Sequence, residues 1–453
     1  MKTFIAGLIL AIILIPYGIM SVDLAVKKTP TDFKTLYSSS HRLAQNKSAY
    51  YKEDHAHSTN LCPPFLTALI APITLHFDYT QTFLAWSLLS CALFAVALGL
   101  GYFCFRHSRE GDNRAMYQSP ESSAGGHLSE SQNLDNKKHT NNTEVIKLLS
   151  TITLGFLFSF TFFNITFGQV ALTLAFLTTL IWIALKNSYP ITAGCLLGIT
   201  INIKLFFGFL FLFLLIKKHY RACIACITAI LTINTILLLI YGPSIFINYI
   251  STLHHVYWYQ ANWNASIYGF FSRIFGSPMP KITSLLYYPK LSFGLYAFSS
   301  LLITFFSLRA IMKSSSLDFS FCLSLVTMLL VSPLGWAYYF PLLFIPVFFL
   351  LKEARSMKQP SLMQLGVSAV LFLASLPYPL MQTVTVPKNI LLTWHSTPFY
   401  ALFLLWVIMF TLPNKARSLT TGPALPRPIL SLALFTALSP GIAAIVMTMV
   451  KWY

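Results

Sequence analysis

Charged residues are scarce in this chain: Asp, Glu, Lys and Arg make up only 10% of its 453 residues. A soluble domain carries about 25% charged residues. Hydrophobic residues reach 56%, and the mean hydropathy is +0.66. A soluble multi-domain protein is therefore excluded. We expect a single integral membrane domain over residues 1–453, built from several apolar spans of about 20 residues each.

Acidic residues are rarer still, with 13 Asp and Glu against 31 Lys and Arg and a net charge of +18. The basic residues lie in short clusters between apolar runs, as in Lys217-Lys218-His219-Tyr220-Arg221. Cytoplasmic loops of polytopic proteins show this pattern. It does not indicate nucleic-acid binding, and we expect no nucleic-acid partner.

Motifs for soluble chemistry are also missing. The chain has no HExxH sequence, no P-loop, no GxGxxG at a strand–helix junction and no nucleophile elbow. Most of its seven cysteines lie within apolar runs or at their ends, and only Cys62 clearly faces a polar loop. This pattern indicates small buried side chains, not a disulfide framework. We expect no cofactor and no metal ligands.

Apolar runs are what the chain does have. The first follows Lys2 and lacks a cleavage site, which indicates an uncleaved signal-anchor with a cytoplasmic N-terminus. The runs are 4–20, 63–77, 80–105, 148–166, 169–185, 189–216, 222–241, 289–308, 317–331, 335–351, 361–378, 396–412 and 428–449.

Two runs need interpretation. Residues 63–77 are short and contain three prolines, and residues 189–216 are too long for one span and contain Lys204. If 63–77 is re-entrant and 189–216 turns back at Lys204, then 19 of the 31 Lys and Arg residues lie inside; if 63–77 crosses, only seven do. The positive-inside rule favours the first arrangement. It predicts an all-α bundle of about 11–13 transmembrane helices, with an outer loop at 21–79 that carries juxtamembrane helices and a disordered cytoplasmic loop at 106–147.

Ionisable groups near membrane depth are costly and mark candidate sites. Lys204 is a phosphate-binding cation facing the outer side or a lysine that snorkels to the interface. Asp32, just beyond the first span, is a general base or a helix N-cap, and the two roles are compatible. Gln169, after Gly168, binds a sugar hydroxyl or phosphate, or caps a helix. Arg273 is a second candidate phosphate partner.

The segment 253–266 is dense in aromatic, His and Asn residues, and Ser332 to Tyr339 interrupt two spans. Trp and Tyr are common interface anchors, and stacking on a sugar is the functional alternative. Adjacent histidines face different sides of a helix, so His254 and His255 are a weak metal site. The candidate substrate-binding residues are Tyr37, Gln169, His254, His255, Asn264, Trp336 and Tyr339.

In chain order, seven short motifs resemble those of glycosyltransferase family 87, over roughly residues 20–345. They are Asp32-Phe33 with Tyr37, Ser48-Ala49-Tyr50, Cys62-Pro63-Pro64-Phe65, Gly168-Gln169-Val170, Ala193-Gly194 through Gly198 to Lys204, Asn264-Ala265-Ser266 with Gly269, and Ser332-Pro333 with Trp336. One departure follows: actinobacterial members commonly continue the last motif with acidic and His residues, whereas this chain has Ala337-Tyr338-Tyr339. A role of that histidine therefore does not transfer.

The resemblance implies a GT-C fold in a bacterial inner membrane. It implies transfer of a hexose or pentose, mannose as first choice, from a polyprenyl-phosphate sugar to a lipid or glycan acceptor at the outer face. Asp32 would be the catalytic base, and Lys204 and Arg273 would bind the donor phosphate. We expect a monomer among membrane lipids. Two rivals remain: a lipid-linked glycan flippase or transporter, and an O-antigen ligase or polymerase.

Overall fold

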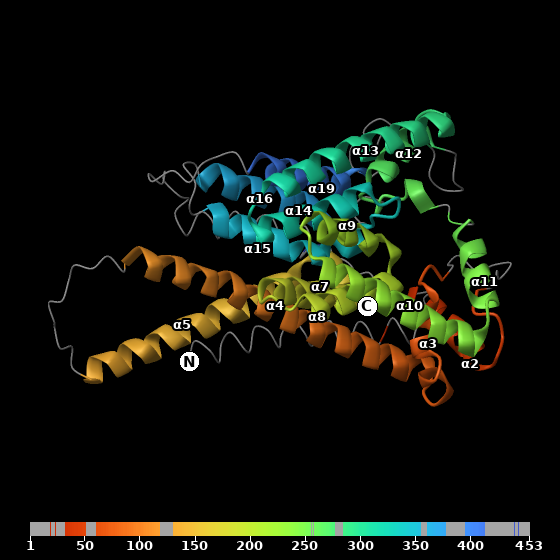
Figure 1. The fold of residues 1–453 in the computed structure, drawn as a ribbon, viewed down its shortest axis with the longest axis horizontal. Coiled ribbons are helices and arrows are strands. Elements are labelled where there is room, and N and C mark those ends of the chain that lie inside the picture. Colours follow the sequence, from red (N-terminus) through yellow and green to blue (C-terminus); the bar gives the residue numbers. More distant parts are fainter. Residues whose placement is uncertain are drawn as a thin grey trace.

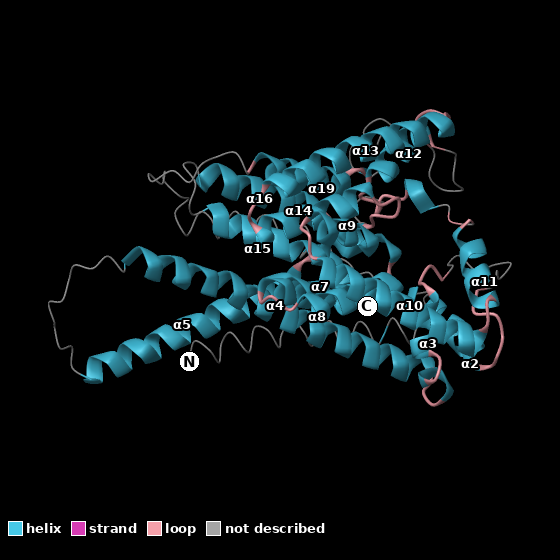
Figure 2. Cartoon of the chain, in the orientation of Figure 1, coloured by secondary structure: helices cyan, strands magenta, loops and turns pink. Residues whose placement is uncertain are grey.

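A computed structural model describes residues 32–50, 60–117, 130–254, 256, 258–276, 284–354, 360–376 and 395–412, together with 19, 23, 439 and 443; side chains of 107–143 and of 360 are not described. Within these ranges the regular structure is helical (Figure 2), apart from one isolated bridge between Asn264 and Trp336. This confirms the predicted all-α class.

The helices form a bundle that extends along the long axis of the molecule (Figure 1). Helices α8 and α10 pack together, with α7 against α8 and α4 against α7, while α13, α14, α16 and α19 form a second group. The main helices are α4 (Tyr79–Tyr117), α5 (Glu130–Leu157), α6 (Ser159–Phe167), α7 (Ala171–Lys186), α8 (Pro190–Ile203), α9 (Gly208–Ile216), α10 (Tyr220–Tyr241), α13 (Pro289–Lys313), α14 (Leu317–Val331), α15 (Phe344–Glu353), α16 (Pro360–Ser375) and α19 (Thr397–Thr411).

Short elements connect and cover the bundle. Helix η4 packs against α6, α7 and α14 and so joins the two groups. The short elements are α2 (Asp32–Ala44), α3 (Pro64–Ile70), η1 (Ile73–Leu75), η2 (Leu205–Phe207), α11 (Ser244–Leu253), η3 (Trp258–Gln260), α12 (Ile267–Phe275) and η4 (Ala337–Leu343).

Several helices are apolar enough to cross a membrane. Among the described residues, Tyr79–Arg106, α10 and α13 are also long enough, and Glu144–Leu157 with α6 makes a further span that is bent by 65°. Eight more apolar helices have 10–17 residues. At about 1.5 Å per residue these are shorter than a hydrocarbon core of about 30 Å. The multi-pass character is confirmed; the number 11–13 stays a prediction, since the runs 4–20 and 428–449 lie outside the described residues.

The chain reverses at Lys204, as predicted. Gly194 of α8 contacts Ala222 at the start of α10, Gly198 contacts Cys226, and Asn234 Nδ2 donates to Asn202 Oδ1 over 2.8 Å. These pairs advance in the same direction, so α8 and α10 are parallel. The chain between α8 and α10 must therefore run back to the level where α8 began, and α9 runs in that direction. A Gly-x-x-x-Gly face against small residues lets the two backbones approach closely.

The run 63–77 does not cross the bundle. Helix α3 has seven residues, starts directly after Pro63 and is followed by Pro72 and the three-residue η1. A helix of seven residues is about 10 Å long. It packs on α2, α8 and α10 near the end of the bundle, which agrees with the re-entrant segment that the charge distribution predicts.

The predicted disordered loop at 106–147 is largely helical. Helix α4 continues to Tyr117 and α5 begins at Glu130. Both stretches lack proline, and Pro120 lies in the part of the chain between them, so no proline interrupts a helix in either stretch. Residues 118–129 lie outside the described residues.

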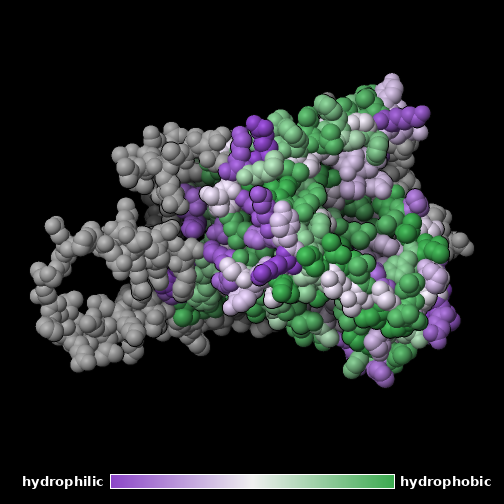
Figure 3. Space-filling model, viewed as in Figure 1, coloured by the Kyte–Doolittle hydropathy of each residue, from purple (hydrophilic) through white to green (hydrophobic). Residues whose placement is uncertain are grey.

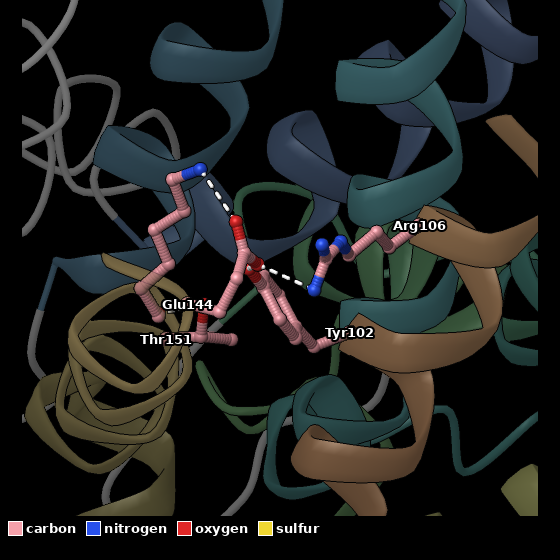
Figure 4. A network of polar contacts seen from close by, with 5 residues as sticks. Tyr102, Arg106, Glu144 and Thr151 are labelled. Carbon is pink, nitrogen blue, oxygen red and sulfur yellow. Dashed lines mark hydrogen bonds and ion pairs between the residues drawn. The ribbon is translucent and has the colours of Figure 1, made fainter. Parts of the chain in front are cut away.

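On the face shown in Figure 3, polar residues gather in a band beside the grey atoms and along the right edge, with mostly apolar surface between them. At one end of the long axis Glu144 accepts a hydrogen bond from the Tyr102 hydroxyl at 2.7 Å and pairs with Arg106 and Lys147 at 2.8 and 2.9 Å (Figure 4). At the same end of the spans, Lys186 pairs with Asp318 at 3.2 Å. Arg106 and Lys186 belong to the residues that we expect inside, and which face is cytoplasmic stays a prediction.

Replacing Gly194 by Ala tests the contact between α8 and α10. A Cβ atom there would collide with the Ala222 carbonyl oxygen, which is backbone and cannot rotate away. We expect a loss of about 1–3 kcal/mol, seen as a lower Tm of the detergent-solubilised protein. The matched control is Gly294→Ala on α13, where nothing lies within 4 Å of the new Cβ, and Tm should hold or rise because Ala favours helix. Equal Tm values for both variants would contradict the close packing.

Candidate active site

Four segments that are far apart in the sequence meet at the end of the bundle that carries α2 and α11 (Figure 1). They are the start of α2, the turn between α6 and α7, the break after α8, and η4. Gln169 donates a hydrogen bond to Asp32, Lys204 interacts electrostatically with Asp32, and Lys204 lies in hydrogen-bonding range of the Tyr339 hydroxyl. Four of the predicted site residues are thus brought together.

Asp32 is positioned by the residue that follows it. The Phe33 side chain is 1% exposed, and its ring packs against Tyr79, Phe83 and Trp86 with centroid separations of 6.3, 5.6 and 5.6 Å. This packing of Phe33 fixes the first turn of α2 against α4. Asp32 is therefore held where the turn after α6 passes.

Gly168 makes room for this arrangement. It ends α6 with φ of +65°, a left-handed conformation that favours glycine. A side chain there would overlap Phe33. The Gly168 carbonyl accepts a hydrogen bond of 3.1 Å from Trp86 Nε1. The turn is thus locked between Phe33 and Trp86, and it directs the next residue, Gln169, toward Asp32.

Gln169 uses its side chain on Asp32 and does not cap a helix. Its Nε2 donates to Asp32 Oδ2, its backbone N–H donates to the Asn164 carbonyl at 2.8 Å, and the N-cap of α7 is Val170. An amide donor stabilises and orients the ionised carboxylate. Binding of a sugar hydroxyl or a phosphate by Gln169 stays a prediction.

Burial raises the pKa of Asp32 from 3.8 to about 6, and nearby Lys204 lowers it. Asp32 is an exposed residue, and one of its carboxyl oxygens accepts the hydrogen bond from Gln169. Such a group is ionised at neutral pH and yet is more basic than an ordinary aspartate. A carboxyl group with a pKa near the working pH is suited to general-base catalysis.

Lys204 stands where the apolar run is broken. It ends α8 with extended backbone angles of −148° and 115°, and η2 follows at once. The side chain is half-buried. Its neighbours are Cys62, Tyr249 and Tyr339. The ammonium therefore lies within the protein beside Asp32, and it is enclosed by groups from the first outer loop, α11 and η4.

Tyr339 and Trp336 form one wall of the site. Their rings are stacked, with centroids 6.5 Å apart and an angle of 10°, and Phe206 meets Tyr339 edge-on at 4.7 Å. Asn164 Nδ2 donates to the Tyr338 carbonyl at 2.7 Å, which ties η4 to α6. An aromatic wall of this kind suits stacking on a sugar.

Asn264 joins the wall to the loop before α12. It is fully buried, its Nδ2 donates to the carbonyls of Tyr259 and Pro333 at 3.0 Å each, and its Oδ1 accepts from Ser266 N–H at 3.2 Å. Its amide is thus engaged with the protein. The position supports a structural role, and direct contact of Asn264 with substrate stays a prediction.

Arg273 is likewise turned into the protein. Its Nε donates to Ser396 Oγ at 3.0 Å, and its Nη1 donates to the carbonyls of Ala261 and Asn264, both at 2.9 Å. The side chain is 4% exposed, and Nη2 is buried with no partner among the described residues. Arg273 braces the loop before α12, and its predicted role at the donor phosphate stays a prediction.

The remaining predicted residues are dispersed. The Tyr37 hydroxyl donates to the Phe77 carbonyl at 3.0 Å. His254 is exposed at the end of α11, and His255 lies outside the described residues. Within the described ranges, no three His, Cys, Asp or Glu side chains come together to hold a metal ion. The expectations for substrate contacts and for metal remain untested.

Tyr249 and Cys62 also lie near Lys204 and were not predicted as site residues. Tyr249 lies on α11, and Cys62 lies in the loop before α3, where its carbonyl accepts a hydrogen bond of 2.6 Å from the Tyr50 hydroxyl. Cys62 stands out in the sequence because it faces a polar loop. Tyr249 lies in an ordinary amphipathic stretch, and only the tertiary fold brings it to Lys204.

The fold and site define a multi-pass membrane protein with a carboxylate, an amide and an ammonium group converging at one end of an apolar bundle. The sequence profile of glycosyltransferase family 87 matches residues 60–333. The chain therefore belongs to this family and is a membrane glycosyltransferase. Gln169 and Lys204 lie inside the matched range, whereas Asp32 and Tyr339 flank it. No curated protein matches the chain.

The raised pKa of Asp32 predicts how sugar transfer depends on pH. If the reaction needs the carboxylate, the rate should fall about tenfold per pH unit below about 6 and level off above it. Lys204→Met removes the charge that lowers this pKa, so the midpoint should move to higher pH. Initial rates in membranes between pH 4.5 and 8 measure both effects. A midpoint near 4 in the parent protein, or no shift in the variant, would contradict the electrostatic pairing.

Proposed function

We propose that the chain transfers a hexose or pentose from a polyprenyl-phosphate sugar to a lipid or glycan acceptor. The observation that carries the proposal is the convergence of Asp32, Gln169 and Lys204 at one end of an apolar bundle. A donor anchored in the bilayer delivers its phosphate at such an end. A carboxylate can take up the proton of the acceptor hydroxyl, and a cation can stabilise the leaving phosphate.

The reaction assigns one task to each group. The acceptor hydroxyl gives its proton to an Asp32 carboxylate oxygen while its own oxygen forms a bond to the anomeric carbon of the sugar. The bond from that carbon to the phosphate oxygen breaks, and the electron pair leaves with polyprenyl phosphate. Negative charge on this phosphate increases as the bond breaks, so the fixed cation Lys204 stabilises the transition state more than the ground state. Gln169 holds the carboxylate in place.

The setting of the reaction follows from the same proposal. The distribution of Lys and Arg favours an outer face for the Asp32 end and a cytoplasmic N-terminus. We place the protein in a bacterial inner membrane as a monomer among membrane lipids. Mannose is the first sugar to test, and other hexoses and pentoses follow.

The first test is transfer from radiolabelled donors. Membranes with the protein are incubated with a panel of polyprenyl-phosphate sugars, and release of polyprenyl phosphate and labelled product is measured. Asp32→Asn should lower the rate by about 10²–10⁴-fold, because the general base is lost. Asparagine preserves the shape of the Asp32 side chain on α2, so the amount of folded protein should stay the same.

Asp78→Asn is the matched control. Asp78 Oδ1 accepts a hydrogen bond of 2.8 Å from Gln81 N–H at the start of α4, and Asn caps a helix as well as Asp does. Its rate should stay near that of the parent protein. An active Asp32→Asn enzyme, or an equal loss in Asp78→Asn, would remove the basis for Asp32 as the base.

A further inference from the structure

Among the described residues, the ammonium group of Lys204 has no carboxylate partner at ion-pair distance. Within the described ranges, no carboxylate oxygen lies within 4.0 Å of it, and Asp32 interacts with it only over a longer distance. Enclosing a charge without a partner costs several kcal/mol. A half-buried cation without a carboxylate partner in the described part of the chain indicates a site for an anion from outside.

Tyr249 on α11 is a second polar group that interacts with Lys204. Its side chain is only 6% exposed, and it interacts electrostatically with Lys204. Its ring packs on Tyr50 with centroids 5.3 Å apart. The described part of the chain offers its hydroxyl no hydrogen-bonding partner, although the hydroxyl oxygen is not sealed from solvent. Buried polar groups in proteins are normally hydrogen-bonded. A solvent-accessible tyrosine hydroxyl without a protein partner can therefore donate a hydrogen bond to a ligand.

Contacts with the first outer loop hold Tyr249 in place. The Tyr50 hydroxyl donates to the Cys62 carbonyl at 2.6 Å, and Asn248 Nδ2 donates to Ser48 Oγ at 3.2 Å. A small cluster separate from the main core surrounds these bonds; its buried members are Leu43, Ala49, Tyr50, Ala71, Ile245 and Tyr249. The position of the Tyr249 hydroxyl is thus built into the fold.

Tyr339 supplies the third group. It is 3% exposed, and Phe206 and Trp336 fix its ring. Its hydroxyl oxygen lies in hydrogen-bonding range of the Lys204 ammonium. When Lys204 donates to this oxygen, the Tyr339 O–H remains free to donate onward. Lys204 thus interacts electrostatically with one phenol hydroxyl from α11 and another from η4.

We propose that Lys204, Tyr249 and Tyr339 form the phosphate-binding site of the enzyme, with Tyr249 as a direct hydrogen-bond donor to a phosphate monoester. This inference rests on the proposed function and assigns to Tyr249 a role in it. It places the phosphate beside Lys204 and leaves Arg273 to brace the loop before α12. It also makes α11 part of the substrate site.

The chemistry of the three groups fits a phosphate that gains charge. Burial raises the pKa of Tyr249 to about 12, so its hydroxyl stays protonated and keeps its donor at neutral pH. Cleavage of the sugar–phosphate bond converts a phosphodiester with one negative charge into a monoester with up to two. A cation with two neutral donors can satisfy the added lone pairs without a second buried cation.

Binding of farnesyl phosphate to the purified full-length protein tests the site without any turnover. Farnesol tests binding of the prenyl group without phosphate, and inorganic phosphate tests binding of the headgroup without lipid. Thermal shift or calorimetry gives the Kd of each ligand. Tyr249→Phe removes one oxygen and keeps the ring against Tyr50. We expect the Kd of farnesyl phosphate to rise about 10-fold or more, as for a lost hydrogen bond to a charged group. Farnesol binding should not change.

The control variant is Tyr296→Phe, which removes a hydroxyl that donates to the Val331 carbonyl at 3.0 Å; its Kd for farnesyl phosphate should match the parent value. If Lys204→Met weakens the binding of farnesyl phosphate and Tyr249→Phe does not, Tyr249 is excluded as a phosphate ligand while the proposed function stands. If Lys204→Met leaves the Kd of farnesyl phosphate unchanged, or if farnesyl phosphate binds no better than farnesol, the phosphate site beside Lys204 is overturned together with the proposed function. Retention of inorganic phosphate alone would identify a free-anion site and overturn the lipid-linked donor.

Discussion

The reversal of the chain at Lys204 is the constraint on which the site depends. A lysine inside an apolar run is stable only if its ammonium reaches polar surroundings, and ending α8 at Ile203 allows this. The reversal is possible because the glycine face of α8 packs directly on α10 and leaves the end of α8 at the level of Asn234. Helix α9 then returns toward the second group of helices. The same packing that shapes the bundle thus sets the depth of the cation.

Around Lys204, aromatic packing and backbone hydrogen bonds hold the polar groups in place. Phe33 and Gly168 interlock so that Asp32 and Gln169 meet. Backbone hydrogen bonds join the loop before α12 to the segment before η4, between Ala265 and Gly335 at 2.9 Å and between Ala337 and Trp263 at 2.7 Å. The polar site therefore rests on a scaffold of aromatic contacts and buried backbone bonds, as preorganised electrostatic catalysis requires.

Much of this could be predicted from the sequence, for physical reasons. Hydropathy locates the spans because lipid requires long apolar helices, and the scarcity of polar groups makes Lys204, Asp32 and Gln169 conspicuous. The count of basic residues also identifies both the re-entrant segment and the reversal. Tyr249 and the packing of Phe33 could not be predicted, since aromatic residues are abundant here and a single sequence does not show which of them meet. The helices that enter 106–147 could not be predicted either, because their polar composition is typical of disorder.

The small cluster around Tyr50 and Tyr249 has a consequence for how the molecule moves. It buries six side chains, whereas the main core runs through most of the bundle. The free energy of opening a local unit scales with the contacts that it buries. Helix α11 and the loop near Tyr50 therefore form the part of the site that separates at the lowest cost, with the bundle and the packing of Phe33 intact. One tyrosine pair and two hydrogen bonds hold this contact together.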